Sequence, residues 1–155
     1  MKNVTRTAGY SLLLGLALGL SGCAAHSTDQ SAADDTPDVA LANTYWKLTE
    51  LADGPVADTQ DDQREAHFVL HEDDQRVAGA TGCNQLMGNY SQDDTHIAFE
   101  QLATTMMACP ETAGAERAYL NALNQVERWE VNGKTLTLTN DDSETLARFQ
   151  AVHLY

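Results

Sequence analysis

The stretch from Glu116 to Leu138, ERAYLNALNQVERWEVNGKTLTL, decides the fold because its hydrophobic period changes halfway along. In the first half, apolar residues recur at spacings of three and four, which predicts an amphipathic helix within residues 111–128. In the second half, Asn132-Gly133 separates two alternating runs, which is the signature of a two-residue type I′ hairpin. This stretch therefore predicts one helix followed by paired antiparallel strands.

Further runs with a period near two lie on both sides of this stretch and predict more strands. They cover residues 44–51, 66–71, 76–82, 96–105 and 145–152, with a short strand beginning at Tyr90. Because there are no repeated crossover helices, a parallel α/β sheet is excluded. We expect an α+β fold: an antiparallel, curved, partly open barrel-like sheet of about seven or eight strands packed on one amphipathic helix. The expected core comprises Trp46, Leu48, Phe68, Leu70, Phe99, Leu120, Leu123, Val126, Trp129 and Leu138.

The N-terminal residues have the pattern of a bacterial lipoprotein signal. Lys2 and Arg6 precede an apolar run that is too short to span a bilayer, which is typical of a secretory signal. The run closes on Leu20-Ser21-Gly22-Cys23, which resembles a lipobox. An ordinary signal peptide with a chance cysteine is the alternative. We predict a signal peptide over residues 1–22 and lipidation of Cys23, because two or three acyl chains hold a protein firmly at a membrane.

The residues after Cys23 indicate a destination and a tether. Ala24 and Ala25 follow the cysteine, where an aspartate would favour retention at the inner membrane, so the resemblance favours the periplasmic face of the outer membrane. Residues 24–42 are small and polar without apolar periodicity, which is typical of a flexible tether. We therefore expect a lipidated tether over residues 23–42 and one domain over residues 43–155.

Acidic residues dominate the composition. The net charge is −14, and loss of Lys2 and Arg6 with the signal leaves −16, so we expect no nucleic-acid partner. Asp-Asp pairs begin at positions 34, 61, 73, 93 and 141, and four of the five fall in polar gaps between apolar runs. Aspartate favours turns, and no calcium loop of the D-x-[DN]-x-[DN]-G type is present, so these pairs predict solvated acidic turns.

Four segments together resemble one family. NTYWKLTEL, GATGCNQLMGNY, ATTMMACPET and LTLTNDDSETLARF are similar, in this order, to the META domain (HslJ-like) family over roughly residues 43–152. The resemblance implies an antiparallel, partly open barrel-like sheet with a helix, in agreement with the hydrophobic pattern. Its members are associated with envelope stress, drug tolerance, secretion or motility, without an established activity.

The cysteines offer three interpretations. With Cys23 lipidated, Cys83 and Cys109 are the remaining thiols, in a compartment that permits disulfides, and the family's corresponding cysteines are thought to pair. A copper site made by these cysteines with Met106 and Met107 is the first alternative, although adjacent strand residues face opposite sides and methionine is more often core filler.

A catalytic thiol is the second alternative, and it would need a base. His67 and His71 share a strand face, with His96 as a third candidate nearby, but no nucleophile motif surrounds either cysteine. The glycines beside Cys83 have a structural use, since Gly79, Gly82 and Gly88 permit positive φ and tight bends.

These observations predict a monomeric, lipid-anchored META-domain protein of the envelope, without enzymatic activity, cofactor or bound metal. Its expected role is that of a binding or scaffolding module in stress tolerance, and a periplasmic copper-handling lipoprotein is the alternative. The expected partners are the membrane, through the lipid on Cys23, and an envelope protein or hydrophobic ligand. The open end of the curved sheet is the expected binding place.

Overall fold

The computed structural model describes residues 37–56 and 65–152 of the chain. Ten elements occur in this part, nine strands and one helix. They are β1 (Tyr45–Leu51), β2 (Gly54–Pro55), β3 (Ala66–His71), β4 (Arg76–Thr81), β5 (Gln85–Gln92), β6 (Ile97–Thr104), α1 (Ala113–Gln125), β7 (Arg128–Asn132), β8 (Thr135–Thr139) and β9 (Thr145–Val152).

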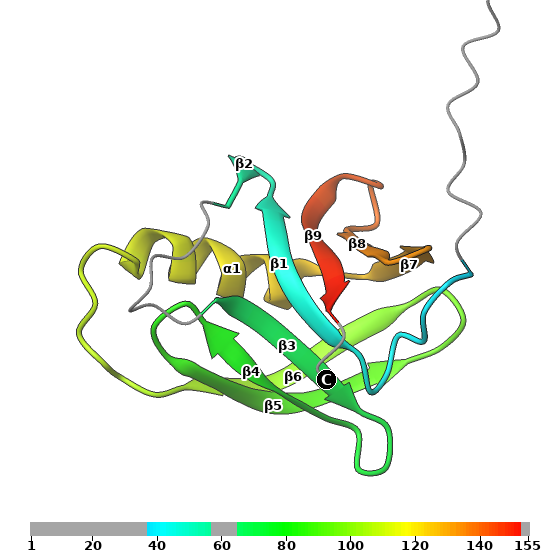
Figure 1. Ribbon diagram of the computed structural model, residues 1–155, viewed down its shortest axis with the longest axis horizontal. Coiled ribbons are helices and arrows are strands. Elements are labelled where there is room, and N and C mark those ends of the chain that lie inside the picture. Colours follow the sequence, from blue (N-terminus) through cyan, green and yellow to red (C-terminus); the bar gives the residue numbers. More distant parts are fainter. Residues whose placement is uncertain (1–36, 57–64, 153–155) are drawn as a thin grey trace, which may run out of the picture. The chain divides into compact units, whose positions relative to one another are not determined.

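All strand pairs are antiparallel, and they form one curled sheet in the order β6-β5-β4-β3-β1-β9-β8-β7, with β2 added beside β1. The first strand of the described part, β1, therefore lies in the middle of the sheet. One meander, β3 to β6, extends to one edge, and a second, β7 to β9, returns from the other edge to β1 (Figure 1). This arrangement confirms the predicted α+β fold with a curved antiparallel sheet.

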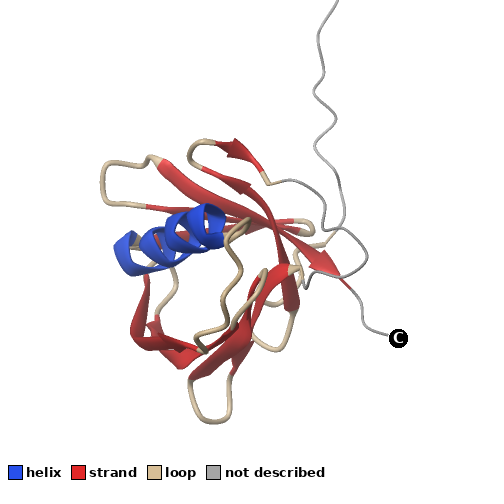
Figure 2. Ribbon diagram, turned by 90° about the vertical axis from the view of Figure 1, so that its left-hand side faces the viewer, coloured by secondary structure: helices blue, strands red, loops and turns tan. Residues whose placement is uncertain are grey.

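The helix α1 joins the two edges of the sheet. It lies between β6 and β7 in the chain and contacts β6, β9, β4 and β1, and Figure 2 shows the sheet curling around it. The two edge strands meet at one end through an antiparallel bridge between His96 and Arg128. There, Ile97 N donates to Glu127 O (3.1 Å) and Trp129 N to Thr95 O (3.2 Å). The sheet is thus nearly closed at this point and open beyond it.

Large side chains fill the concave side of the sheet. Trp46, Phe68 and Phe149 have no exposed surface, and the two phenylalanine rings pack edge-to-face with centroids 4.8 Å apart. Tyr119, Ala122 and Leu123 form the buried stripe of α1. The prediction of the core is confirmed for eight of its ten residues, whereas Leu120 and Trp129 are only partly buried and pack at its border.

The start of one strand and the position and type of the hairpin turn differ from the predictions. The strand predicted to begin at Tyr90 begins at Gln85, because Leu86 alternates inward with Tyr90. The hairpin turn is Gly133-Lys134 rather than Asn132-Gly133, since Asn132 pairs with Thr135 and this register turns the leucines of β8 inward. Gly133 has a positive φ of 57°, whereas the φ of Lys134 is not positive. This combination is the pattern of a type II′ turn.

No helix in the described part of the chain is long and apolar enough to cross a membrane. The predicted signal peptide, the lipidation site Cys23 and most of the predicted tether lie outside the described residues.

Candidate functional site

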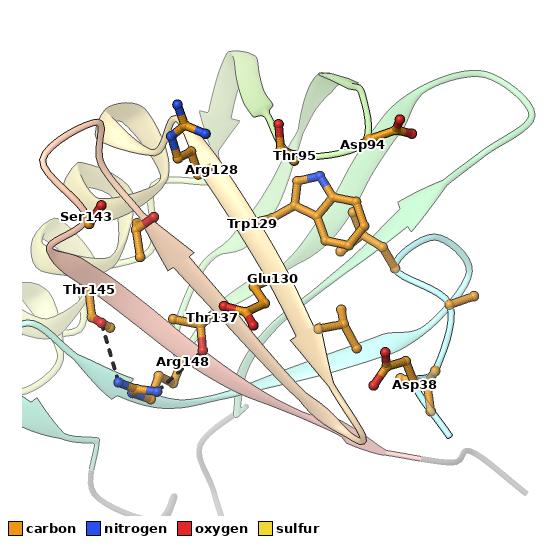
Figure 3. A pocket seen from close by; sticks show the side chains of 15 residues that line it. Asp38, Asp94, Thr95, Arg128, Trp129, Glu130, Thr137, Ser143, Thr145 and Arg148 are labelled. Carbon is orange, nitrogen blue, oxygen red and sulfur yellow. Dashed lines mark hydrogen bonds between the residues drawn. The ribbon is translucent and has the colours of Figure 1, made fainter. Parts of the chain in front are cut away.

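A hollow lies at the edge strand β7, away from the open end of the sheet where we expected a binding place. Buried side chains, among them Trp46, Phe68, Phe149 and Tyr119, occupy the concave side of the sheet. The hollow, which we call the β7 groove, has a volume of about 890 Å³ and is lined from both faces of β7 (Figure 3). Its position follows from the chain path, because the N-terminal segment 38–41 passes beside β7 before β1 begins.

One half of the β7 groove is apolar. Trp129 and Val131 alternate onto this face of β7, and Val39 and Leu41 line the same hollow. The indole of Trp129 is fixed because its Nε1–H donates to the carbonyl oxygen of Asp93 (3.0 Å). This half therefore offers a preformed apolar surface at the border of the core.

The other half is polar and has loosely held charges. Arg148 Nη1 and Nη2 lie 3.4 Å from the hydroxyls of Thr137 and Thr145, at the limit of hydrogen bonding. Arg148 Nε lies 3.4 Å from a Glu50 carboxylate oxygen, and Arg128 Nε lies 4.0 Å from Asp141. Glu130 lines this half with no ion pair among the described residues.

A tight turn fixes one end of the groove. The backbone N–H groups of Thr95 and His96 donate to Asp93 Oδ1 at 2.9 and 2.8 Å. These bonds favour the charged carboxylate and lower the pKa of Asp93. The turn thereby holds Asp94 and Thr95 at the rim of the groove.

The predicted pairing of the cysteines is confirmed. Cys83 and Cys109 form a disulfide with their Cα atoms 6.4 Å apart, and it joins the β4–β5 turn to the segment before α1. Both sulfurs are used in this bond. Neither cysteine is therefore available as a thiol nucleophile or as a thiolate ligand, as the catalytic and copper interpretations required.

Asn84 links the same corner to the helix. Its side chain is buried, and Nδ2 donates to both carboxylate oxygens of Glu116 at 3.0 and 2.9 Å. Its Oδ1 accepts from Thr105 Oγ1 (2.9 Å) and from Met107 N (2.7 Å). Asn84 thus joins the turn after β4, the end of β6 and the first turn of α1, next to the disulfide.

The three glycines near Cys83 are required for different structural reasons. Gly82 has φ 102°, as predicted for a bend. Gly79 and Gly88 lie inside β4 and β5, and their predicted positive φ is wrong. At Gly79 a Cβ would collide with the His67 carbonyl of β3, and at Gly88, beside a β-bulge, it would lie 2.9 Å from the Glu100 carbonyl oxygen. Both positions therefore need glycine for the close approach of neighbouring strands.

The methionines of the described part are surface residues rather than the core filler that we expected. Met87, Met106 and Met107 are the exposed large apolar side chains of the described part, and Met106 is 99% exposed. The thioethers are accessible, but their cysteine neighbours are bonded to each other. Within residues 37–56 and 65–152, no three His, Cys, Asp or Glu side chains gather as a metal site would require.

A polar cluster lies on the outer face of β1 and β3, beside His67. The Tyr45 hydroxyl donates to Glu65 Oε1 (2.8 Å), and Lys47 Nζ lies 3.0 Å from Glu65 Oε2. Burial raises the pKa of Tyr45, and its bond to the carboxylate raises that pKa further. Burial alone would raise the pKa of Glu65, but the bonds from Tyr45 and Lys47 outweigh it and lower that pKa.

The histidines do not form a catalytic group with a cysteine. His67 stacks on Tyr45 with ring centroids 4.3 Å apart, and His71 follows on the same face of β3. His96 lies at the bridge between β6 and β7, so its predicted proximity to His67 is wrong: β4 and β5 intervene between β3 and β6. The acidic turns are confirmed where they are described, at positions 73, 93 and 141, and the pairs at 34 and 61 lie outside the described residues.

Comparison with known proteins identifies the class that this fold and disulfide define. The chain matches the META domain over residues 39–153 and belongs to that family. It is similar to a protein from Burkholderia xenovorans solved by NMR, with 27% identity and a TM-score of 0.60, covering 78% of this chain and 97% of that one. A second NMR structure has 20% identity and a TM-score of 0.55 over 71% of this chain and 91% of the other, and shows the shared fold alone. No protein with a curated description matches the chain.

The sequence reasoning missed the β7 groove and the role of Asn84. The groove combines residues 38–41, the β5–β6 turn and β7 to β9, which no sequence spacing connects. The alternation of Trp129 and Val131 along a predicted hairpin strand was the available signal. Asn84 was visible only as a turn residue, because its partners lie 21 to 32 positions away.

Proposed function

We propose that this META-domain protein is a lipid-anchored, non-catalytic binding or scaffolding module of the bacterial envelope, acting in stress tolerance at the periplasmic face of the outer membrane. The observation that carries the proposal is the Cys83–Cys109 disulfide. Disulfides persist in oxidising compartments outside the cytosol. Because this bond uses both cysteines of the domain, Cys23 in its lipobox-like setting is the cysteine left for lipid.

The site geometry supports binding rather than catalysis. The two sulfurs that could have acted as nucleophiles are bonded to each other. The β7 groove offers an apolar half around Trp129 and a polar half around Arg148, which is the mixed lining that binding sites use. The stress role is the one that the family resemblance implies.

Metabolic labelling with an alkyne-tagged fatty acid tests the anchor. We expect label on the wild-type protein and on Cys83→Ser, which keeps the lipobox-like motif, and none on Cys23→Ser. Density-gradient fractionation should place the labelled protein with the outer membrane. Equal label on Cys23→Ser, or an unlabelled wild-type protein in the soluble fraction, would contradict the proposal.

Complementation tests the stress role. A strain without the gene should survive outer-membrane stress less well than the parent, and the wild-type chain should restore survival, whereas Cys23→Ser should not. Full rescue by Cys23→Ser would show that anchoring is irrelevant to the role.

A further inference from the structure

We propose that the β7 groove binds an extended peptide segment by strand addition, with an apolar residue opposite Val131 and basic residues on either side of it. This inference rests on the proposed binding role and names the class of ligand. Strand addition requires unpaired backbone groups at a sheet edge together with pockets for side chains that alternate between the two faces.

Val131 provides the unpaired backbone groups, between the 93–95 turn, which contacts the edge at Trp129, and residues 38 and 39, which contact it at Gly133. Trp129 N–H points away from β8, since it donates to Thr95 O at 3.2 Å. Alternate residues of a strand point their backbone groups the same way, so Val131 N–H and C=O also point away from β8. Past Thr95 the chain turns away from β7, and no backbone hydrogen bond between described residues reaches the outward groups of Val131.

The lining of the groove on both faces of β7 provides the side-chain pockets. Cross-strand neighbours lie on the same face of a sheet, so a residue opposite Val131 places its side chain in the apolar half, beside Trp129 and Val39. The two residues flanking it point to the other face, toward Glu130 and Arg148. A hollow that continues over both faces of an edge strand matches the alternation of an added strand.

Charge favours basic flanking residues. Three carboxylates line the groove, those of Asp38, Asp94 and Glu130. Its two guanidinium groups, Arg128 and Arg148, lie within 4.0 Å of acidic residues outside the lining, so they are already partly neutralised. The groove thus presents net negative charge to a ligand.

The same charge argues against two other occupants. A second copy of this chain has a net charge of −14 and would be repelled. The preceding segment of this chain, residues 24–36, contains three aspartates and no lysine or arginine. A basic, extended segment of another polypeptide is the occupant that the charges favour.

Fluorescence anisotropy with a labelled, acetylated and amidated peptide, Gly-Lys-Val-Lys-Gly, tests the proposal on the full chain in non-ionic detergent. Val131→Pro removes the outward N–H and leaves the β8 ladder intact, whereas Val131→Thr keeps the N–H. We expect saturable binding to the wild type, at least about tenfold weaker binding to Val131→Pro, and binding to Val131→Thr within about threefold. Circular dichroism checks that both variants fold.

Two altered peptides keep the test independent of any folding defect. N-methylation of the peptide valine removes the N–H that would donate to Val131 C=O, and we expect about tenfold weaker binding. Gly-Glu-Val-Glu-Gly should bind more weakly still. Equal binding of the N-methylated peptide, or no saturable binding to the wild type, would overturn the proposal. So would a wild-type dimer in sedimentation that Val131→Pro abolishes, because a second copy would then fill the groove.

The lipid-anchor proposal and the peptide-binding proposal can each be contradicted without the other. Fatty-acid labelling of Cys23 without peptide binding would support the lipid anchor and contradict peptide binding in the β7 groove. Peptide binding by a chain that is never lipidated would support the groove and contradict the anchor.

Discussion

Replacing Asn84 tests whether the disulfide corner depends on one buried amide. Asn84→Ala removes four side-chain hydrogen bonds: two to Glu116, one from Thr105 and one from Met107 N–H. The two neutral bonds contribute about 1 kcal/mol each, and the pair to the half-buried Glu116 carboxylate adds about 1 kcal/mol after discounting for solvent. We therefore expect a loss of about 3 kcal/mol of unfolding free energy.

Urea unfolding followed by tryptophan fluorescence measures this loss. With a slope of about 1.5 kcal/mol per molar urea, the midpoint should fall by about 2 M. The control is Asn89→Ala, which removes an exposed amide whose Nδ2 donates to Gln101 Oε1, and it should change stability by less than about 0.5 kcal/mol. A midpoint for Asn84→Ala close to that of the wild type would refute the role given to this amide.

Asn84→Asp adds a pH test to the same position. The introduced carboxyl group would face the Glu116 carboxylate where an amide now donates to it, so its pKa should be raised above the unfolded value. A group with a raised acidic pKa binds its proton more readily in the folded state, so stability falls as pH rises through that range. Relative to wild type, the variant should be least stable at pH 7 and should recover toward pH 4. A difference that does not depend on pH would contradict the geometry.

Three further predictions concern the bridge, a close strand contact and an ion pair. Cys83→Ser should lower the unfolding free energy by about 3 to 4 kcal/mol, since the bridge spans 26 positions, and reduction of the wild type should give the same midpoint; a reductant-insensitive wild type would refute this. Gly79→Ala should destabilise by several kcal/mol through its clash with β3, whereas Gly114→Ala, in open space on α1, should stabilise by about 0.5 kcal/mol; equal thermal midpoints would refute the contrast. Glu65→Gln should lower stability at pH 7 by less than about 1 kcal/mol. Because folding lowers the Glu65 pKa, this deficit should shrink as pH falls from about 4, the unfolded pKa, through the lower folded pKa, and a deficit that does not change with pH would contradict it.

The sheet was predictable because its strands carry local information. The alternation of residues 66–71 and 145–152 predicts β3 and β9 with their observed bounds. The helix was predictable in the same way, since Tyr119 and Leu123 lie one turn apart on its buried face. One-sided burial imprints a period of two or 3.6 on any such segment.

The errors came from contacts that periodicity does not report. Asn132-Gly133 is a strong turn signal, but the inward alternation of Leu136 and Leu138 shifts the hairpin register by one residue. Gly79 looks like a bend residue, yet its reason is the close approach of β3, which depends on the folded sheet. The β7 groove exists because the curled sheet brings the N-terminal segment beside the edge strand.

The central claim is that every cysteine of the chain has an assigned use: Cys23 for lipid, Cys83 and Cys109 for the bridge. Intact-mass analysis of the protein extracted from cell envelopes, with maleimide added before or after reduction, tests this directly. The account predicts a chain that begins at acylated Cys23, with no maleimide on the native protein and two on the reduced protein. A full-length chain beginning at Met1, or maleimide on the unreduced protein, would contradict it.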